Sequence, residues 1–443
     1  MKKIHIALFI SIALLAGCKT GSMKCCSAKS ECSQMSHPAV KTGVEVLFSD
    51  RLDLIRGKRV GLITNPSGVD SHLDSIVELF RAQPDVTLVA LYGPEHGVRG
   101  DAQAGQTVPF YYDEHFKMPV FSLYGQTEKP PIGMLTNIDE YMRSYDTQKA
   151  GKTPAGNALS GIDAMIYDLQ DVGTRVYTFE ATLAYAMQAC ANAGIPIIVL
   201  DRPNPINGVT MEGPVLDYPK YSSFIGLCAT PLRHGMTIGE LAQFYNDKFL
   251  TNKANLTVVK MENWKRDEWY DETGLPWVMP SPNIPTLESA VVYPGQVMLE
   301  GTDLSEGRGT THPFEIFGAP WIDGYTLAQK LNDLHLPGVK FREIWFTPTF
   351  SKFQGQLCGG CQIHVTDRNA YRAIATSLNI LAMIKQMYGD KLEFHNKYFD
   401  RVLGNSTVRE GLEKGEPVDK IIADYQSGLD EFAKSREKYL LYQ

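Results

Sequence analysis

The chain has 443 residues and a formal net charge of -7, with 44% hydrophobic and 21% charged residues. This length accommodates two or three domains of ordinary size, and the composition is that of a globular protein. The negative charge argues against a nucleic-acid partner, because phosphate binding needs clustered lysine and arginine. Beyond the N-terminus no apolar run is long enough to predict a transmembrane helix.

The N-terminal residues have the features of an export signal. Lys2 and Lys3 precede a mostly apolar run that closes as Leu15-Ala16-Gly17-Cys18. This ending resembles the bacterial lipobox, which implies cleavage before Cys18 and lipid modification of that residue; plain secretion is the alternative. We therefore expect an exported lipoprotein, periplasmic or on the cell surface, that meets the membrane only through its lipid anchor.

A polar tether is expected after the signal peptide, over residues 18–43, because large apolar residues are scarce there and Lys, Ser, Thr and Gly are common. Three cysteines, Cys25, Cys26 and Cys32, lie in this stretch, and their pairing is left open.

From residue 59 onward, apolar β-branched runs alternate with amphipathic segments. Strands are expected over 59–63, 86–92, 119–124, 163–169, 195–200 and 256–261. Helices are expected over 70–83, 177–192 and 236–247. Gly194 ends the second of these as a C-cap, and Thr237 with Glu240 forms a capping box for the third. A polar insertion, 127–159, carries a short helix around 138–145. The alternation predicts a Rossmann-like, doubly wound α/β domain.

Polar residues follow four of these strands. In a doubly wound sheet, ligands bind outside the carboxyl ends of the strands, so these exits are expected to form one polar rim. The candidates are Asn65 after the first strand, Glu95, His96, Arg99 and Asp101 after the second, Asp171 and Arg175 after the fourth, and Asn204 after the fifth. The first exit reads Asn65-Pro66-Ser67-Gly68 and is not a glycine-rich nucleotide fingerprint, so no cofactor is expected.

Tryptophan and proline become frequent after about Asp267, which predicts a domain boundary. The proposed division is signal peptide 1–17, tether 18–43, catalytic domain 44–268 and C-terminal auxiliary domain 269–443, with a boundary near 323 as the alternative. Helices over 325–334 and 370–388, with extended segments over 341–347 and 361–365, predict a smaller α+β domain. The tail, 408–442, is helical and charged.

Two of the later cysteines form a CxxC motif, Cys358 and Cys361. No second CxxC or histidine pair stands nearby, so a structural disulfide or two free thiols is favoured over a zinc or redox site. Cys190 and Cys228 are expected to be core thiols.

A second segment dense in charge runs from Glu300 to Thr310 and contains Asp303, Glu306 and Arg308 among glycines. A surface loop with internal salt bridges is one reading. Together with the rim, however, the carboxylates and arginines favour hydrolysis of a polar, anionic substrate. Paired carboxylates supply an acid and a base or nucleophile for glycosidic cleavage, and arginine recognises a carboxylate.

Five motifs in order closely resemble the NamZ-type exo-β-N-acetylmuramidase family, formerly a domain of unknown function. They are GPEHGVRGDAQAG at 93–105, QDVGTRVYT at 170–178, DRPNPING at 201–208, MPSPNIPT at 279–286 and EGTDLSEGRGT at 300–310. The resemblance implies a Rossmann-like domain, an auxiliary domain and an active site in the cleft between them. It also implies release of terminal N-acetylmuramic acid from the non-reducing end of peptidoglycan fragments, in cell-wall turnover or recycling. The family often has asparagine at the position of Asp303, so that residue is given no role.

Glu95 is the predicted general acid/base, with His96 orienting it or the substrate. The second catalytic group is predicted to be Glu306, with Asp171 as the alternative. The remaining candidates are substrate-binding residues: Arg99, Arg175 and Arg308 for a carboxylate, Tyr177 and Asn204 for N-acetyl or hydroxyl groups, and Asn65 and Asp101.

Two other classes stay open. A non-catalytic peptidoglycan-binding lipoprotein would use the same cleft, and Trp264, Trp269, Trp277 and Trp321 would serve stacking in either case. A metal-dependent hydrolase would use Glu95, His96, Asp101 and Asp171, although neighbouring residues such as Glu95 and His96 point apart on regular elements.

Overall fold

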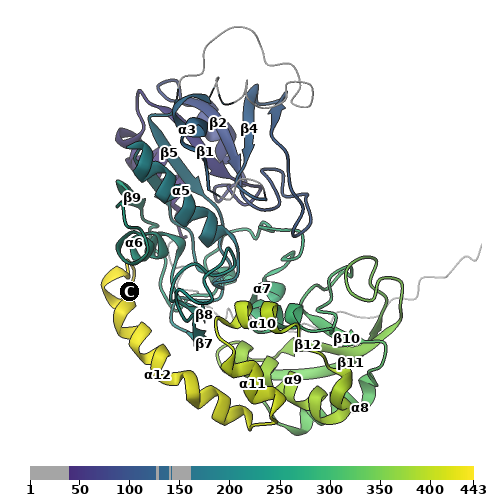
Figure 1. Ribbon diagram of the computed structural model, residues 1–443. Coiled ribbons are helices and arrows are strands. Elements are labelled where there is room, and N and C mark those ends of the chain that lie inside the picture. Colours follow the sequence, from purple (N-terminus) through teal and green to yellow (C-terminus); the bar gives the residue numbers. More distant parts are fainter. Residues whose placement is uncertain (1–38, 126–128, 139–140, 142–160) are drawn as a thin grey trace, which may run out of the picture. The chain divides into compact units, whose positions relative to one another are not determined.

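The computed structural model describes residues 39–125, 129–138, 141 and 161–443 (Figure 1). The expected signal peptide, Cys18, the cysteines of the expected tether and the helix expected around 138–145 lie wholly or largely outside these residues. The described residues belong to one compact unit.

The first part of the chain forms a seven-stranded sheet. Its spatial order is β3 (Tyr111–Asp113), β4 (Met118–Ser122), β2 (Thr87–Gly93), β1 (Arg59–Thr64), β5 (Ala164–Asp168), β6 (Ile197–Leu200) and β9 (Leu256–Val259). All neighbours pair in parallel except the edge strand β3. The six parallel strands therefore have the order 3-2-1-4-5-6 of dinucleotide-binding folds, which confirms the predicted Rossmann-like sheet.

Helices cover both faces of this sheet (Figure 1). In β5, Ala164 and Ile166 pack into the cluster that contains residues of α1 (Gly43–Asp50) and α2 (Ile76–Arg81). The alternate residues, Met165 and Tyr167, pack into the cluster that contains residues of α3 (Ile132–Thr136), α5 (Phe179–Ala193) and α6 (Ile238–Lys248). Because successive side chains on a strand point to opposite faces, a fully apolar strand is required here.

Most predicted boundaries are confirmed to within a few residues, including the C-cap at Gly194 (φ +69°) and the capping box of Thr237 and Glu240. The helix expected over 70–83 is shorter and begins only after Ser75. The reason is local: the carboxylate of Asp70 accepts hydrogen bonds from the backbone of His72 and Asp74, which holds a turn in place of the first helical turn.

The last residues of the expected tether are folded. Val40 and Thr42 are buried, and Thr42 starts α1 through a capping box with Glu45. Lys41 also pairs with Glu262 at 3.0 Å. Residues 40–43 of the expected tether therefore belong to the folded part that the structure describes, where α1 packs against β6 and β9.

The second part contains a three-stranded antiparallel sheet, β10 (Ile316–Ala319), β12 (Cys358–Val365) and β11 (Val339–Phe346), in that order. Helices α8 (Gly324–Asp333) and α9 (Ala373–Tyr388) accompany it, as the predicted α+β class requires. The sequence did not predict the hairpin of β7 (Glu212–Val215) and β8 (Pro231–Arg233), α7 (Leu287–Gln296) or α10 (Asn396–Leu403). The described residues also form α11 (Thr407–Glu413), α12 (Val418–Arg436) and short 3₁₀ turns at Leu52–Leu54, Tyr270–Glu272, Val297–Gly301, Gly389–Lys391 and Glu437–Tyr439.

The end of the chain is fastened to the Rossmann-like part. Helix α12, yellow in Figure 1, is followed by a short segment that reaches α6. Arg436 donates to the carbonyl of Gly235 at 2.6 Å, and the Tyr442 hydroxyl donates to Asp201 at 2.6 Å. The carbonyl of Gln443 accepts from the backbone N–H of Arg266 at 3.1 Å. These buried contacts make the C-terminal residues part of the fold.

A buried ion pair fills the point where the strand order reverses, between β1 and β5. The Arg202 guanidinium contacts both oxygens of Asp168, at 2.5 and 2.7 Å, and also donates to the carbonyl of Val69. Ser67, in the loop after β1, accepts from the backbone of Gln170. The crevice that binds a pyrophosphate in nucleotide-binding relatives of this fold is thus lined with mutually bonded side chains.

Cys358 and Cys361 are free thiols on opposite faces of β12, since Cys361 belongs to the main core and Cys358 packs with Ile316 and Phe346. Their odd spacing on a strand directs them apart. Burial raises the pKa of Cys358 to about 11 and of Cys361 to about 12, so both resist oxidation. Cys190 and Cys228 are buried free thiols, as predicted.

Candidate active site

A pocket of about 420 Å³ opens at the carboxyl ends of β2, β4 and β5. One group of lining residues comes from the Rossmann-like part: Glu95, His96, Gly105, Tyr124, Val176, Tyr177 and Thr178. The other group follows residue 280 and includes Ser281, Asn283, Tyr293, Glu300, Arg308, Phe314, Tyr398 and Val402. The volume suits a small polar ligand.

Glu95 is held rigidly on the first wall. It follows β2, whose last residue, Gly93, lies so close to the next loop that a Cβ atom there would come within 2.8 Å of the backbone nitrogen of Val98. The carboxylate is 7% exposed. One oxygen accepts from the N–H of Gly105 at 2.9 Å and the other from the Thr178 hydroxyl at 2.7 Å. Its neighbours therefore fix the orientation of both oxygens.

His96 lines the same wall with a backbone φ of +73°, an uncommon conformation for a non-glycine residue. Its Nδ1 lies 2.7 Å from the carbonyl oxygen of Ala102. A carbonyl only accepts hydrogen bonds, so Nδ1 carries the proton and Nε2 is the acceptor of the neutral ring. Burial, assisted by Arg308, lowers the pKa of His96 and favours this neutral form against the opposing effect of Glu95.

The second wall carries Glu300, Arg308 and Tyr398. One oxygen of Glu300 accepts from Arg308 at 2.7 Å, and the other accepts from the Tyr398 hydroxyl at 2.7 Å. Burial acts to lower the pKa of Arg308, but the carboxylates of Glu300 and Glu306 raise it above its ordinary value. The Arg308 guanidinium also lies over the ring of Phe314, 5.0 Å from its centroid. The wall thus presents a fixed carboxylate and a permanent cation.

Glu306, the residue predicted as the second catalytic group, does not line this pocket. It is 2% exposed, and its oxygens lie 3.5 Å from Nε of Arg308 and 3.0 Å from Nζ of Lys352. Lys352 donates in addition to the carbonyls of Leu299 and Leu304. The structure therefore gives Glu306 a bracing position behind Arg308, and Glu300 is the carboxylate that reaches the pocket.

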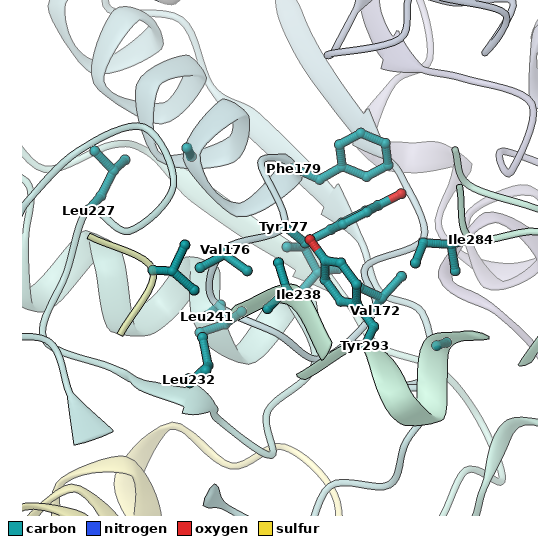
Figure 2. Packing of buried hydrophobic residues seen from close by; sticks show 14 of the residues in the cluster. Val172, Val176, Tyr177, Phe179, Leu227, Leu232, Ile238, Leu241, Ile284 and Tyr293 are labelled. Atoms are coloured by element: carbon teal, nitrogen blue, oxygen red, sulfur yellow. The ribbon is translucent and has the colours of Figure 1, made fainter. Parts of the chain in front are cut away.

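Tyr177 lies in an aromatic group with Phe179 and Tyr293, at ring-centroid distances of 4.6 and 6.0 Å, and Ile284 lies nearby (Figure 2). Its hydroxyl makes no hydrogen bond of normal geometry within the described part of the chain. Burial raises the pKa of Tyr177 well above its ordinary value, against the effect of the nearby Ser281. The phenol is thus a neutral hydrogen-bond donor at the pocket.

Four predicted binding residues are occupied elsewhere. Asn65 donates to the carbonyl of Pro280 at 2.8 Å, and Asn204 donates to the carbonyl of Met236 at 2.9 Å. Arg175 is buried and donates to three backbone carbonyls, those of Pro214, Thr230 and Val402. Arg99 pairs with Asp113 at 3.0 Å and its side chain is 65% exposed. These side chains satisfy backbone groups or pair locally, and they do not line the pocket.

Asp101 is exposed and also lies outside the pocket lining. The set predicted for a metal-dependent hydrolase is therefore not brought together. The tryptophans proposed for stacking are absent from the lining as well: Trp264 and Trp269 are core residues, and the aromatic side chains at the pocket are Tyr124, Tyr177, Phe224, Tyr293, Phe314 and Tyr398.

Asp171 lies in a buried cluster with Glu180 and His234, whose ligand-type atoms are within 4.8 Å of one another. These three residues are the set in the described chain that could hold a metal ion. However, Nδ1 of His234 accepts a hydrogen bond from the N–H of Met236 at 3.1 Å. A neutral histidine that binds a metal through Nε2 carries its proton on Nδ1. In His234 this proton would point at the N–H of Met236, so the three side chains fit a metal ion poorly.

Sequence reasoning missed Glu180, His234, Thr178 and Tyr398. Glu180 and His234 lie outside the five motifs and carry no motif of their own. Glu300 and Thr178 lie inside the motifs quoted above, and the signal for them was present, but sequence alone does not show which acidic side chain of a loop points inward.

A sugar-sized pocket with fixed carboxylates on two walls, at the carboxyl edge of a Rossmann-like sheet, defines a hydrolase of polar substrates. The chain belongs to the NamZ exo-β-N-acetylmuramidase family, a family of glycoside hydrolases. The model of the family's N-terminal part matches residues 60–153 and 140–288, and that of its C-terminal part matches residues 291–442. The resemblance read from the five motifs is thus confirmed.

Three relatives agree with this assignment. The chain is 50% identical over 406 residues to the peptidoglycan beta-N-acetylmuramidase NamZ of Bacillus subtilis (strain 168), covering 91% of this chain and 92% of that protein. A crystal structure of a DUF1343 family protein from Bacteroides fragilis NCTC 9343 superposes with a TM-score of 0.80 at 38% identity, covering 91% and 99% of the two chains. A crystal structure of a second DUF1343 family protein from that organism superposes with a TM-score of 0.70 at 28% identity, covering 92% of this chain and 99% of that one.

Proposed function

We propose that this protein is an exo-acting glycoside hydrolase that releases terminal β-linked N-acetylmuramic acid from the non-reducing end of peptidoglycan fragments, in cell-wall turnover or recycling. The observation that carries the proposal is the presence of Glu95 and Glu300 in one pocket, contributed by two distant parts of the sequence. Family membership and the activity in the name of the Bacillus subtilis relative support the same conclusion.

Glu95 is the proposed acid/base group for the glycosidic oxygen. The N–H of Gly105 and the Thr178 hydroxyl hold it in one orientation, which proton transfer requires. Glu300 faces the pocket as a carboxylate that accepts hydrogen bonds from Arg308 and Tyr398. A fixed negative charge at this position stabilises the positive charge that develops on the sugar ring during cleavage.

Arg308 is the proposed recognition residue for the lactyl carboxylate. Its Nε and Nη2 atoms contact Glu300, whereas Nη1 has no hydrogen-bond partner in the described part of the chain. The remaining donor is suited to a carboxylate oxygen of the substrate. The Tyr177 hydroxyl, which makes no hydrogen bond of normal geometry among the described residues, supplies a second donor at the same pocket.

Recognition of the lactyl group predicts a sharp substrate preference. A chromogenic β-MurNAc glycoside is expected to be hydrolysed, and the β-GlcNAc glycoside, which lacks only the lactyl group, is expected to react at least about a hundredfold more slowly in kcat/KM. The measurement is initial rates of chromophore release for both compounds with one enzyme preparation. Comparable rates for the two glycosides would contradict recognition of the lactyl group. If neither glycoside released the chromophore, the hydrolase assignment would be wrong.

Export and lipid anchoring are proposed on the sequence of residues 2–18 alone, where a basic start and an apolar run precede Leu-Ala-Gly-Cys. Within the described ranges, no helix has the length and apolar character needed to cross a bilayer. Changing Cys18 to alanine is expected to move the full-length protein from the membrane fraction to the soluble exported fraction, with hydrolysis retained. Membrane association that persists in C18A after a high-salt wash would contradict the anchor.

A further inference from the structure

The pocket-lining segment Val176–Thr178 is flanked by two buried acids, Asp171 before it and Glu180 after it. His234 joins them from the end of β8. Its Nε2 lies 3.0 Å from a Glu180 oxygen and 3.7 Å from an Asp171 oxygen. All three side chains are at least nine-tenths buried. One polar atom of each, Oδ1 of Asp171, Oε1 of Glu180 and Nε2 of His234, makes no hydrogen bond of normal geometry in the described chain.

The backbone fixes the tautomer of His234. Because Nδ1 accepts from the N–H of Met236, the ring proton sits on Nε2, between the two carboxyl groups. In a doubly protonated ring, the N–H at Nδ1 would point at the backbone N–H of Met236, which is unfavourable. Burial acts to lower the pKa of His234, whereas the carboxylates of Glu180 and Asp171 raise it above its ordinary value. The N–H of Met236 at Nδ1 opposes a second ring proton, and a neutral ring leaves the two buried carboxyl groups without a counter-ion inside the cluster unless one of them holds a proton.

Charge balance assigns that proton to Asp171. Glu180 accepts from the Tyr245 hydroxyl and faces the buried guanidinium of Arg175, so its charge is compensated. Among the described residues, backbone N–H groups stabilise the Asp171 carboxylate: that of Gly173 donates to it at 2.6 Å, and that of Val172 acts in the same direction. Burial and then the charge of Glu180 raise the pKa of Asp171 to about 7, against the effect of His234. The other groups near the cluster are the phenols of Tyr167 and Tyr177, the Cys228 thiol and the Arg436 guanidinium.

The same contacts control the pocket wall. Asp171 fixes Gly173, and the backbone of Arg175 donates to the carbonyl of Leu232, so the loop is joined to β8, the strand directly before His234. Glu180 lies in the first turn of α5, two residues after Thr178. Thr178 in turn donates to Glu95. A change of charge in the cluster therefore acts on the residue that orients Glu95.

Building on the proposed function, we propose that Asp171, Glu180 and His234 are positioning residues whose shared proton holds Tyr177 and Thr178 in place beside Glu95, and that loss of this proton loosens the pocket wall. Asp171 is then neither nucleophile nor acid/base, and the enzyme loses activity on the alkaline side as Asp171 ionises next to Glu180.

The test is Asp171→Asn, which mimics the protonated acid. At pH 6 its kcat on the MurNAc glycoside is expected to be close to that of the wild type, and the alkaline fall in activity near pH 7 is expected to disappear. Asp201→Asn is the matched control. Asp201 is equally buried with its pKa raised to about 7 by burial, but it contacts Thr237 and Tyr442 and not the pocket. The activity of Asp201→Asn is expected to fall near pH 7 as that of the wild type does.

A second readout does not depend on hydrolysis. Because the pKa of Asp171 is raised in the folded state, its contribution to stability is complete below the pKa of the unfolded chain and is lost as pH rises through about 7. The Tm of Asp171→Asn is expected to fall less than that of the wild type between pH 4 and 8. Glu180→Gln removes a charge that raises the pKa of Asp171, so its fall in Tm is expected to be smaller than that of the wild type and to end at lower pH.

Several outcomes would overturn the inference. A loss of a hundredfold or more in kcat for Asp171→Asn at every pH would make Asp171 catalytic. The shared proton would be contradicted if Asp171→Asn kept the alkaline fall in activity, or if the Tm profiles of both variants matched that of the wild type. A stoichiometric metal found by elemental analysis of the wild-type protein would also contradict it. If the wild type hydrolyses no MurNAc glycoside, the proposed function fails, while the Tm profiles still decide the role of the cluster.

Discussion

Replacing Glu95 with glutamine is expected to lower kcat on a β-MurNAc glycoside by about a thousandfold while the protein stays folded and still binds its product. Glutamine keeps an oxygen to accept from Thr178 or Gly105 but cannot donate and recover a proton at the glycosidic oxygen. The measurements are steady-state kinetics, thermal unfolding and calorimetric titration with N-acetylmuramic acid. This combination also separates the enzyme from a non-catalytic binding protein, which would tolerate the change.

Asp101→Asn is the matched control for this experiment. Asp101 lies on the same loop, but it is exposed and outside the pocket lining, so its removal is expected to leave kcat and KM close to the wild-type values. If Glu95→Gln retained wild-type turnover, or if Asp101→Asn lost as much, the assignment of the acid/base group would be wrong.

Glu300→Gln and Glu306→Gln are expected to have opposite signatures, although both carboxylates contact Arg308. Glu300 faces the pocket, so loss of its charge is expected to lower kcat by about a hundredfold or more with a small change in stability. Glu306 is buried against Lys352, so its substitution is expected to cost about 1–3 kcal/mol of unfolding free energy and to leave kcat near the wild-type value.

The measurements for this pair are kcat from initial rates and unfolding free energy from denaturant titration, on the same preparations. The reverse pattern, with turnover lost in Glu306→Gln and kept in Glu300→Gln, would return the second catalytic role to Glu306. Equal losses of turnover in both would mean that Arg308, and not either carboxylate, is the group on which catalysis depends.

The strands were predictable because their periodicity is unambiguous. The central parts of the strands before Asn65, Glu95 and Asp171, residues 60–63, 88–92 and 164–167, are continuously apolar, as expected of strands covered on both faces. The converging exits followed from topology, and Glu95, His96, Tyr177 and Arg308 do meet in one pocket. The cap at Gly194 was equally clear, since a left-handed residue strongly favours glycine.

The failures concern where polar side chains point. Asn65, Asn204 and Arg175 are as polar as Glu95 in the sequence, yet they bond to backbone carbonyls at the strand exits. A buried loop must satisfy its backbone groups, and that requirement uses the same residue types as catalysis does. Similarly, Glu300 and Glu306 share one glycine-rich loop, and only the folded backbone decides which of them faces the ligand.

The division of the pocket between two distant stretches of the chain, and the fastening of the last residues onto the Rossmann-like part, bear on when activity first arises. A chain that is still being synthesised or translocated holds Glu95 without Glu300, and a fragment cut between them holds one carboxylate only. With the proposed roles of Glu95 and Glu300, hydrolysis is expected to begin only when both stretches have folded into one pocket. A copy that ends before Glu300 is then expected to be inert toward the wall polymer.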